Sequence, residues 1–259
     1  MVTLLQGLAF VAAVVLLALA GMAAVRRSVE ISTLETHHDV AGFIYAVLGV
    51  VYAVVLGFVV IVVWEQFNAA DQHIHQEAAA IVGVSRLAGS FPEPDRERIR
   101  QALHDYTRTV IDQEWASLAR GELSRDATAR LEGLWQAYRQ VEPRTEQEKA
   151  AYTESLQVLT AFNDLRWQRL FDSREGVPFG MWVVLAAGAV LTVAFSYLFG
   201  VRNVYAQMAI TGTLAAIIAI MMFLIHAIDY PFTGDVQVSR EPFEEALTAL
   251  EANTGVAPR

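Results

Sequence analysis

Four long runs without a charged side chain constrain most strongly what this 259-residue chain can fold into. The runs that contain no Asp, Glu, Lys or Arg are residues 1–25, 40–64, 176–201 and 203–228. Each is long enough to cross a bilayer, because a spanning helix needs about 20 predominantly apolar residues. We therefore predict transmembrane helices at residues 3–25, 40–64, 178–200 and 204–228.

The composition excludes several classes of function. Only 18% of the residues are charged, 54% are hydrophobic, and the mean hydropathy is +0.36, whereas soluble proteins are about 25% charged. A net charge of −9 without any cluster of Lys or Arg argues against a nucleic-acid partner, which a basic patch would have to bind. The absence of Cys excludes disulfides, thiolate nucleophiles and cysteine metal sites.

The runs divide the chain into two helical hairpins with a polar segment between them. The expected divisions are residues 1–64 for transmembrane helices 1 and 2, 65–177 for an extramembrane helical bundle, 178–229 for transmembrane helices 3 and 4, and 230–259 for an acidic tail with a short amphipathic helix. The sequence thus predicts an all-α, two-plus-two membrane protein with a bundle inserted between helices 2 and 3.

Helix start and stop signals organise the bundle. Transmembrane helix 2 should continue to about residue 88, since no Gly or Pro interrupts residues 64–82. Asp95 is expected as the N-cap of the next helix, Ser124 as the start of another, and Thr145 with Glu148 as a capping box. Apolar residues at helical spacing predict the buried faces: Ile99, Leu103, Tyr106 and Val110; Leu131, Leu134, Trp135 and Tyr138; Leu156, Leu159, Phe162, Leu165 and Leu170; Phe243, Leu247 and Leu250.

Helix 2 carries the most informative pattern within the membrane. Five small residues share one face of it, namely Gly42, Ala46, Gly49, Ala53 and Gly57. Such a stripe lets another backbone approach closely, so it indicates tight packing within or between subunits, or alternatively the wall of a pore. Tyr45 and Tyr52 form an adjoining face, where they could line a pathway or hydrogen-bond a neighbour.

Polar residues near the membrane surface offer further candidates. Trp64 and Glu65 at the exit of helix 2, and His226 and Asp229 at the exit of helix 4, could form either an interfacial belt or an ion-binding vestibule. Before helix 2, the residues His37, His38 and Asp39 could cap the helix through Asp39 or sense protons through the two histidines.

No metal or cofactor site is expected. The pairs Asp71–His75 and His73–Glu77 lie four residues apart on different helix faces, which is more typical of a solvated amphipathic helix than of a metal site. The chain also lacks phosphate-loop, nucleophile-elbow, zinc-protease and dinucleotide-binding patterns, so we expect no enzyme. Charge-free membrane cores count against a coupled transporter but permit a channel.

Three arginines decide the expected orientation. Arg26, Arg27 and Arg202 lie in short connections on one side of the membrane, and that side is therefore assigned to the cytoplasm. Both termini and the helical bundle are then expected outside the cytoplasm.

Several motifs resemble the bacterial bestrophin-like domain proteins, a family of membrane proteins. The matching stretches are residues 37–43 (HHDVAGF), 49–58 (GVVYAVVLGF), 64–67 (WEQF) and 229–234 (DYPFTG). The resemblance implies residence in the bacterial inner membrane and similarity to bestrophins, which are pentameric chloride channels whose second transmembrane helix lines the pore. It also implies a cytosolic helical domain, opposite to the side that the arginines indicate. The chain lacks the acidic calcium-clasp run and the paired-Phe neck of true bestrophins.

Two hypotheses follow. The first is an oligomeric anion channel in which helix 2 faces the pore and the bundle forms a vestibule, with the lipid bilayer, further copies of the chain and small inorganic ions as partners. The second is a non-conducting membrane scaffold or sensor whose bundle binds a partner.

Overall fold

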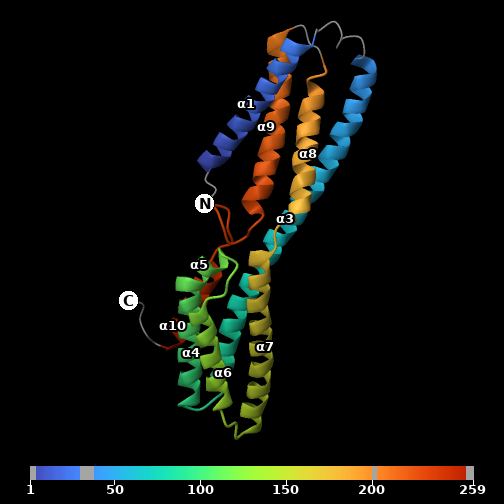
Figure 1. Cartoon of the computed structure of the whole chain (residues 1–259). Helices are drawn as coiled ribbons and strands as arrows, with labels where there is room; N and C mark the ends of the chain where they lie inside the picture. The colour runs from blue at the N-terminus through green and yellow to red at the C-terminus, as the bar shows by residue number, and fades with distance from the viewer. Residues whose placement is uncertain (1–3, 30–37, 200–202, 255–259) are drawn as a thin grey trace. The chain divides into compact units, whose positions relative to one another are not determined.

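The computed structural model describes residues 4–29, 38–199 and 203–254, and every regular element within these ranges is a helix. The elements are α1 (Leu4–Ser28), α3 (His38–Ala88), α4 (Asp95–Thr109), the π-helix η1 (Val110–Glu114), α5 (Trp115–Leu118), α6 (Arg125–Arg139), α7 (Glu146–Arg174), α8 (Phe179–Ser196), α9 (Val204–Ile228) and α10 (Glu241–Thr254). Figure 1 traces them along the chain. The predicted all-α class is confirmed, with four described helices long and apolar enough to cross a membrane.

Two compact units make up the chain. The first, which we call the membrane unit, consists of Met1–Glu65, Gly176–Asp229 and Gly234–Val236. Its outer surface is apolar: the side chains of Leu4 and Phe179, for example, are 80% and 83% exposed. Water-soluble monomers rarely leave apolar surface uncovered on this scale, so the unit is suited to a lipid environment.

Close approaches at glycines hold the membrane helices together. In this unit α1 packs along α9, and α8 contacts both of them (Figure 1). Gly7 of α1 lies directly against the ring of Phe223 on α9. Gly188 of α8 lies against the ring of Tyr52, whose hydroxyl donates a 3.0 Å hydrogen bond to the Leu185 carbonyl. The first half of α3 therefore joins the unit through α8.

The helix bounds match the sequence prediction in part. Helix α3 runs without a break to Ala88, as expected, and α9 begins at Val204, where the Asn203 side chain accepts hydrogen bonds from two backbone N–H groups. Helix α8 ends at Ser196, four residues before the predicted end, because the chain there tightens into three-residue turns.

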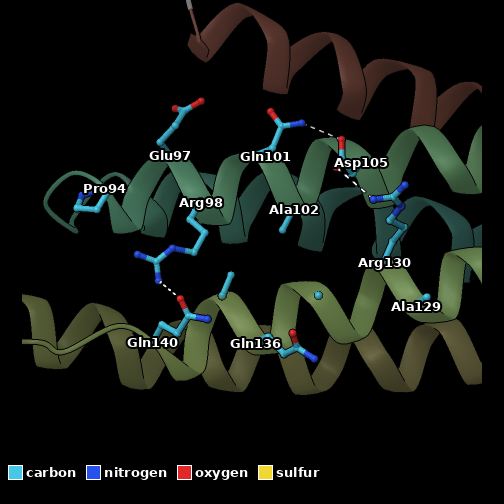
Figure 2. A pocket seen from close by; sticks show the side chains of 12 residues that line it. Pro94, Glu97, Arg98, Gln101, Ala102, Asp105, Ala129, Arg130, Gln136 and Gln140 are labelled. Carbon is cyan, nitrogen blue, oxygen red and sulfur yellow. Dashed lines mark hydrogen bonds and ion pairs between the residues drawn. The ribbon is translucent and has the colours of Figure 1, made fainter.

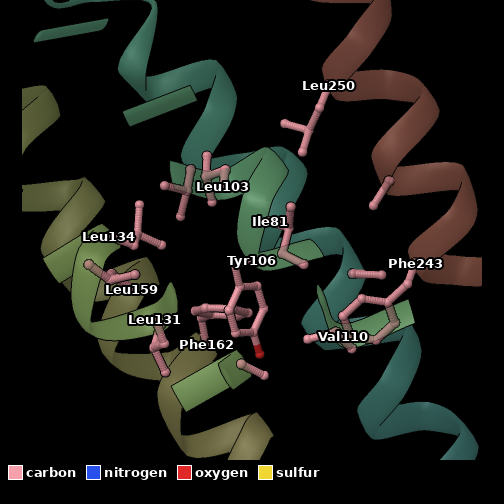
Figure 3. Close-up of a cluster of buried hydrophobic side chains, with 14 of the residues drawn as sticks. Ile81, Leu103, Tyr106, Val110, Leu131, Leu134, Leu159, Phe162, Phe243 and Leu250 are labelled. Carbon is pink, nitrogen blue, oxygen red and sulfur yellow. The ribbon is translucent and has the colours of Figure 1, made fainter. Parts of the chain in front are cut away.

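The second unit, the helical unit, consists of Gln66–Glu175, Tyr230–Thr233 and Gln237–Arg259. Figure 3 shows its core, in which side chains from α3, α4, α6, α7 and α10 converge. The predicted apolar faces are buried there, apart from Trp135, Leu156, Leu165 and Leu247, which are partly exposed. These faces explain why the polar segment folds: each helix presents one apolar stripe to the others.

Two of the three helix caps expected in the helical unit are present. The Ser124 hydroxyl accepts a hydrogen bond from the Ala127 N–H at the start of α6, and Thr145 forms a full capping box with Glu148 at the start of α7. The prediction for Asp95 was wrong: Pro94 occupies the N-cap position of α4, and Asp95 instead pairs with Arg98 at 2.7 Å.

Candidate functional site

The small-residue stripe on α3 is largely uncovered within the single chain. Ala46, Ala53 and Gly57 are exposed, and Gly42 and Gly49 are half-buried. A Cβ atom added at Gly49 or Gly57 would meet no described atom within 4 Å beyond the helix itself. The stripe therefore does not serve the close packing of α3 against the described helices of its own chain.

The adjoining face of α3 is packed. Tyr52 is 8% exposed and bonded to α8, whereas Tyr45 stacks on Phe195 with ring centroids 5.8 Å apart and meets Phe199 edge-on at 5.2 Å. Both tyrosines thus serve the contact between α3 and α8. Helix α3 has one face covered by its own chain and a neighbouring face of small residues that is open.

The candidate residues at the membrane exit fall into separate environments. Asp229 is 2% exposed, and its Oδ1 accepts a 2.6 Å hydrogen bond from the Val177 N–H, which ties the end of α9 to the segment before α8. His226 is exposed and meets the Trp182 ring edge-on at 6.0 Å. Trp64 and Glu65 are exposed at the other exit. Asp229 and His226 therefore contact the start of α8 and the segment just before it.

The candidates before helix 2 lie at the margin of the described structure. His37 is outside the described residues, and the backbone of α3 begins at His38. The side chains of His38 and Asp39 also fall outside what the structure describes. The predicted capping and proton-sensing roles of these residues therefore stay predictions.

The two histidine pairs on α3 face different partners. His73 Nδ1 lies 2.7 Å from Asp172 Oδ2 on α7, and burial raises the pKa of Asp172 above its usual value. His75 stays near Asp71 on the exposed surface. Across the described ranges, no group of three or more His, Asp or Glu residues is arranged to hold a metal ion.

A buried cluster of charges occupies the core of the helical unit. Its members are Glu77 on α3, Tyr106 on α4, Glu114 at the end of η1, and Arg166 and Arg169 on α7, all between 0% and 3% exposed. Glu114 accepts 2.8 Å hydrogen bonds from both guanidinium groups, while Glu77 accepts one of 2.9 Å from the Tyr106 hydroxyl. Two carboxylates thus balance two guanidinium groups inside an otherwise apolar core.

Aromatic rings and the π-helix complete this cluster. The Arg169 guanidinium lies 5.1 Å from the Phe243 ring centroid and 5.6 Å from that of Trp115, at distances typical of cation–π contacts. The segment from α4 to α5 is helical throughout, and the wider π-helical turn η1 ends at Glu114. Such π segments are often found at functional positions.

The sequence prediction missed this cluster, although a signal was present. Arg166 and Arg169 follow Phe162 by four and seven residues, and Glu114 follows Val110 by four. They therefore continue the apolar stripes of their helices. Charged residues in line with a buried stripe indicate paired charges in the core, because single buried charges are too costly.

An open polar groove runs between α4 and α6. It encloses about 640 Å³, and small residues, among them Ala102 and Ala129, line it. Figure 2 shows its polar rim, where Arg98 donates a 2.6 Å hydrogen bond to Gln140 and Arg130 lies 3.5 Å from Asp105. The groove is lined by two arginines, Arg98 and Arg130, and by two carboxylates, Glu97 and Asp105, so its formal charges cancel.

The fold and these surfaces define an all-helical, multi-pass membrane protein. A Bestrophin-like domain matches residues 12–243 of the sequence, and the chain belongs to this family. The predicted family resemblance is thereby confirmed. No curated protein matches the sequence.

Solved structures share the fold. A bacterial bestrophin homolog from Klebsiella pneumoniae is 15% identical, with a TM-score of 0.70 over 95% of this chain and 98% of that chain. Two single-substitution variants of a bestrophin homolog from the same organism are each 14% identical. One has a TM-score of 0.71 over 95% of this chain and 99% of its own, and the other 0.75 over 96% and 98%.

Proposed function

We propose that the protein is an oligomeric, ion-conducting membrane protein that passes anions, with the small-residue stripe of α3 facing the pore. The observation that carries the proposal is the open stripe beside the face of the same helix that contacts α8. In lipid, small residues are enriched where another helix backbone approaches closely. A stripe left uncovered by its own chain is therefore suited to contact further copies of the chain around an axis.

The preference for anions rests on the family and on the charge pattern. Bestrophins of known structure are membrane anion channels, and this chain belongs to the Bestrophin-like family and shares the fold of a bestrophin homolog. The stripe segment contains no carboxylate that would attract cations. Backbone dipoles and apolar constrictions can select and gate ions without charged rings.

Cysteine accessibility tests the pore assignment, because the native chain has no Cys. We propose Ala53→Cys on the stripe and Val51→Cys as the matched control. Two residues along a helix point about 200° apart, and both side chains are exposed in the single chain. A charged, membrane-impermeant thiol reagent should block ion flux through Ala53→Cys and leave Val51→Cys unaffected. Equal effects at the two positions would refute the assignment.

For orientation we propose that the helical unit and both termini lie outside the cytoplasm of a bacterial inner membrane. Arg26 donates a hydrogen bond to Gln207, and Gln207 donates one of 3.0 Å to the Phe199 carbonyl. These contacts bring the end of α1 close to Gln207 and Phe199, the described residues that flank the connection between α8 and α9, which supports counting the two connections on one side of the membrane. Glu142→Cys, at an exposed position, should react with an impermeant label added to intact cells. Protection would favour the bestrophin arrangement instead.

The groove between α4 and α6 favours a second candidate, a non-conducting scaffold that binds a partner. Its small-residue lining and amide-rich rim suit a docked polypeptide. A purified protein that conducts no ions but captures a defined partner, and loses that partner on Gly133→Arg substitution in the groove, would support this candidate over the channel.

A further inference from the structure

We propose that Glu77 is a buried proton-binding site that makes the stability of the helical unit respond to pH. This inference does not depend on ion conduction. The charged and titratable groups that face Glu77 come from three elements. They are Tyr106 of α4, Glu114 of η1, and Arg166 and Arg169 of α7. The neighbouring α5 and α10 contribute the rings of Trp115 and Phe243, which do not titrate.

The two carboxylates of the cluster are not equally compensated. Glu114 binds both guanidinium groups at 2.8 Å, one through each oxygen. Glu77 has a single short contact, the hydrogen bond from Tyr106, and its Oε2 lies 3.4 Å from Arg169 Nε. Among the described residues, no group donates a hydrogen bond to that oxygen. A fully buried carboxylate with one unsatisfied oxygen is costly when ionised.

Protonation relieves that cost without breaking the contact to Tyr106. A protonated Glu77 can donate its own O–H to the Tyr106 hydroxyl oxygen, which also accepts hydrogen bonds. Burial is the largest influence on this group, and it raises the pKa of Glu77 from 4.5 to about 7 although Arg169 lowers it. Between pH 4.5 and about 7, Glu77 is therefore mostly protonated in the folded protein and mostly ionised in the unfolded chain.

The sign of the pH dependence follows from this difference. A carboxyl group with a raised pKa in the folded state contributes stability below its unfolded pKa, and this contribution is lost as the pH rises to the folded pKa. The contribution of Glu77 should therefore be present at pH 4.5 and disappear by about pH 7. Glu77 lies on α3, the same continuous helix that carries the small-residue stripe.

Thermal unfolding of the full-length protein in detergent, followed from pH 4.5 to 8, tests the proposal. The comparison is between wild type and Glu77→Gln, which cannot ionise. The melting temperature of the wild type minus that of the variant should fall as the pH rises, with most of the change below pH 7. The exposed control Glu122→Gln should show a constant difference. A constant difference for Glu77→Gln would overturn the proposal.

A second variant covers the case in which Glu77→Gln does not fold. Tyr106→Phe removes a hydrogen bond that is stronger to the ionised carboxylate than to the neutral acid, so the stability of this variant should decline at a higher pH than that of the wild type. An unchanged or lower midpoint in Tyr106→Phe would contradict the assignment of the proton to Glu77. Neither measurement uses ion flux, so failure of the channel proposal leaves this test intact.

Discussion

Removing the Glu114 carboxylate should destabilise the helical unit more than any surface substitution. Glu114 is fully buried and receives 2.8 Å hydrogen bonds from Arg166 and Arg169, which are themselves 3% and 0% exposed. In Glu114→Ala, Arg166 would keep only its 3.0 Å contact with the Thr128 hydroxyl, and Arg169 would keep the longer contact with Glu77. Neither guanidinium group would then keep a 2.8 Å contact with a carboxylate.

The expected magnitude follows from the cost of an uncompensated buried charge. Deleting one partner of a buried ion pair costs about 3–5 kcal/mol. For a domain of this size, 1 kcal/mol lowers the melting temperature by about 2–4 °C, so Glu114→Ala should melt roughly 6–20 °C below wild type.

The assay is thermal unfolding of the purified full chain in one detergent, with Glu122→Ala as the control. Glu122 is exposed and lies 3.8 Å from Arg120, so its removal should change the free energy of unfolding by about 0.5 kcal/mol or less. If Glu114→Ala melts within the range of Glu122→Ala, the reasoning that the cluster is a mutually dependent set of charges fails.

Three further substitutions probe packing and capping by the same assay. Gly188→Ala forces a Cβ into the Tyr52 ring and should cost about 1–3 kcal/mol, whereas Gly180→Ala on the same helix meets no described atom and should not destabilise; equal effects would contradict the close contact. Ser124→Ala removes the N-cap of α6 and should cost about 1 kcal/mol, an effect that Ser124→Asp should largely avoid. Phe243→Ala empties a fully buried site and should cost about 3–5 kcal/mol; a near-neutral result would mean that α10 does not belong to the core.

The helices were the most predictable part of the structure. A bilayer requires long charge-free runs, and these were visible without any knowledge of the fold. The extension of α3 to Ala88 was predictable because strong helix formers follow the membrane span. The caps at Ser124 and Thr145 were likewise predictable from local chemistry.

The charge cluster was harder to predict because its stability depends on contacts between distant segments. Glu77 and Arg169 are 92 positions apart in the sequence, and their pairing becomes visible only when α3 packs against α7. Glu114 is also the last residue of the π-helix η1, which the apolar spacing of the sequence did not predict. Taken one at a time, such charged residues are typical of a protein surface, although their helical spacing places Glu114, Arg166 and Arg169 on the buried faces.

For the small-residue stripe, prediction from the sequence is limited in a different way. That its residues share one face follows from helical periodicity alone. What covers the face depends on partners outside the chain. The described helices of the same chain leave Ala53 and Gly57 exposed, which argues against packing within the subunit.

Chloride efflux from liposomes that contain the purified protein is the direct test of the proposed channel function. We expect efflux well above that of protein-free vesicles, with chloride preferred over potassium. The contradicting result is efflux equal to that of empty vesicles from protein that still unfolds cooperatively in the thermal assay, because folded protein without flux would exclude the channel.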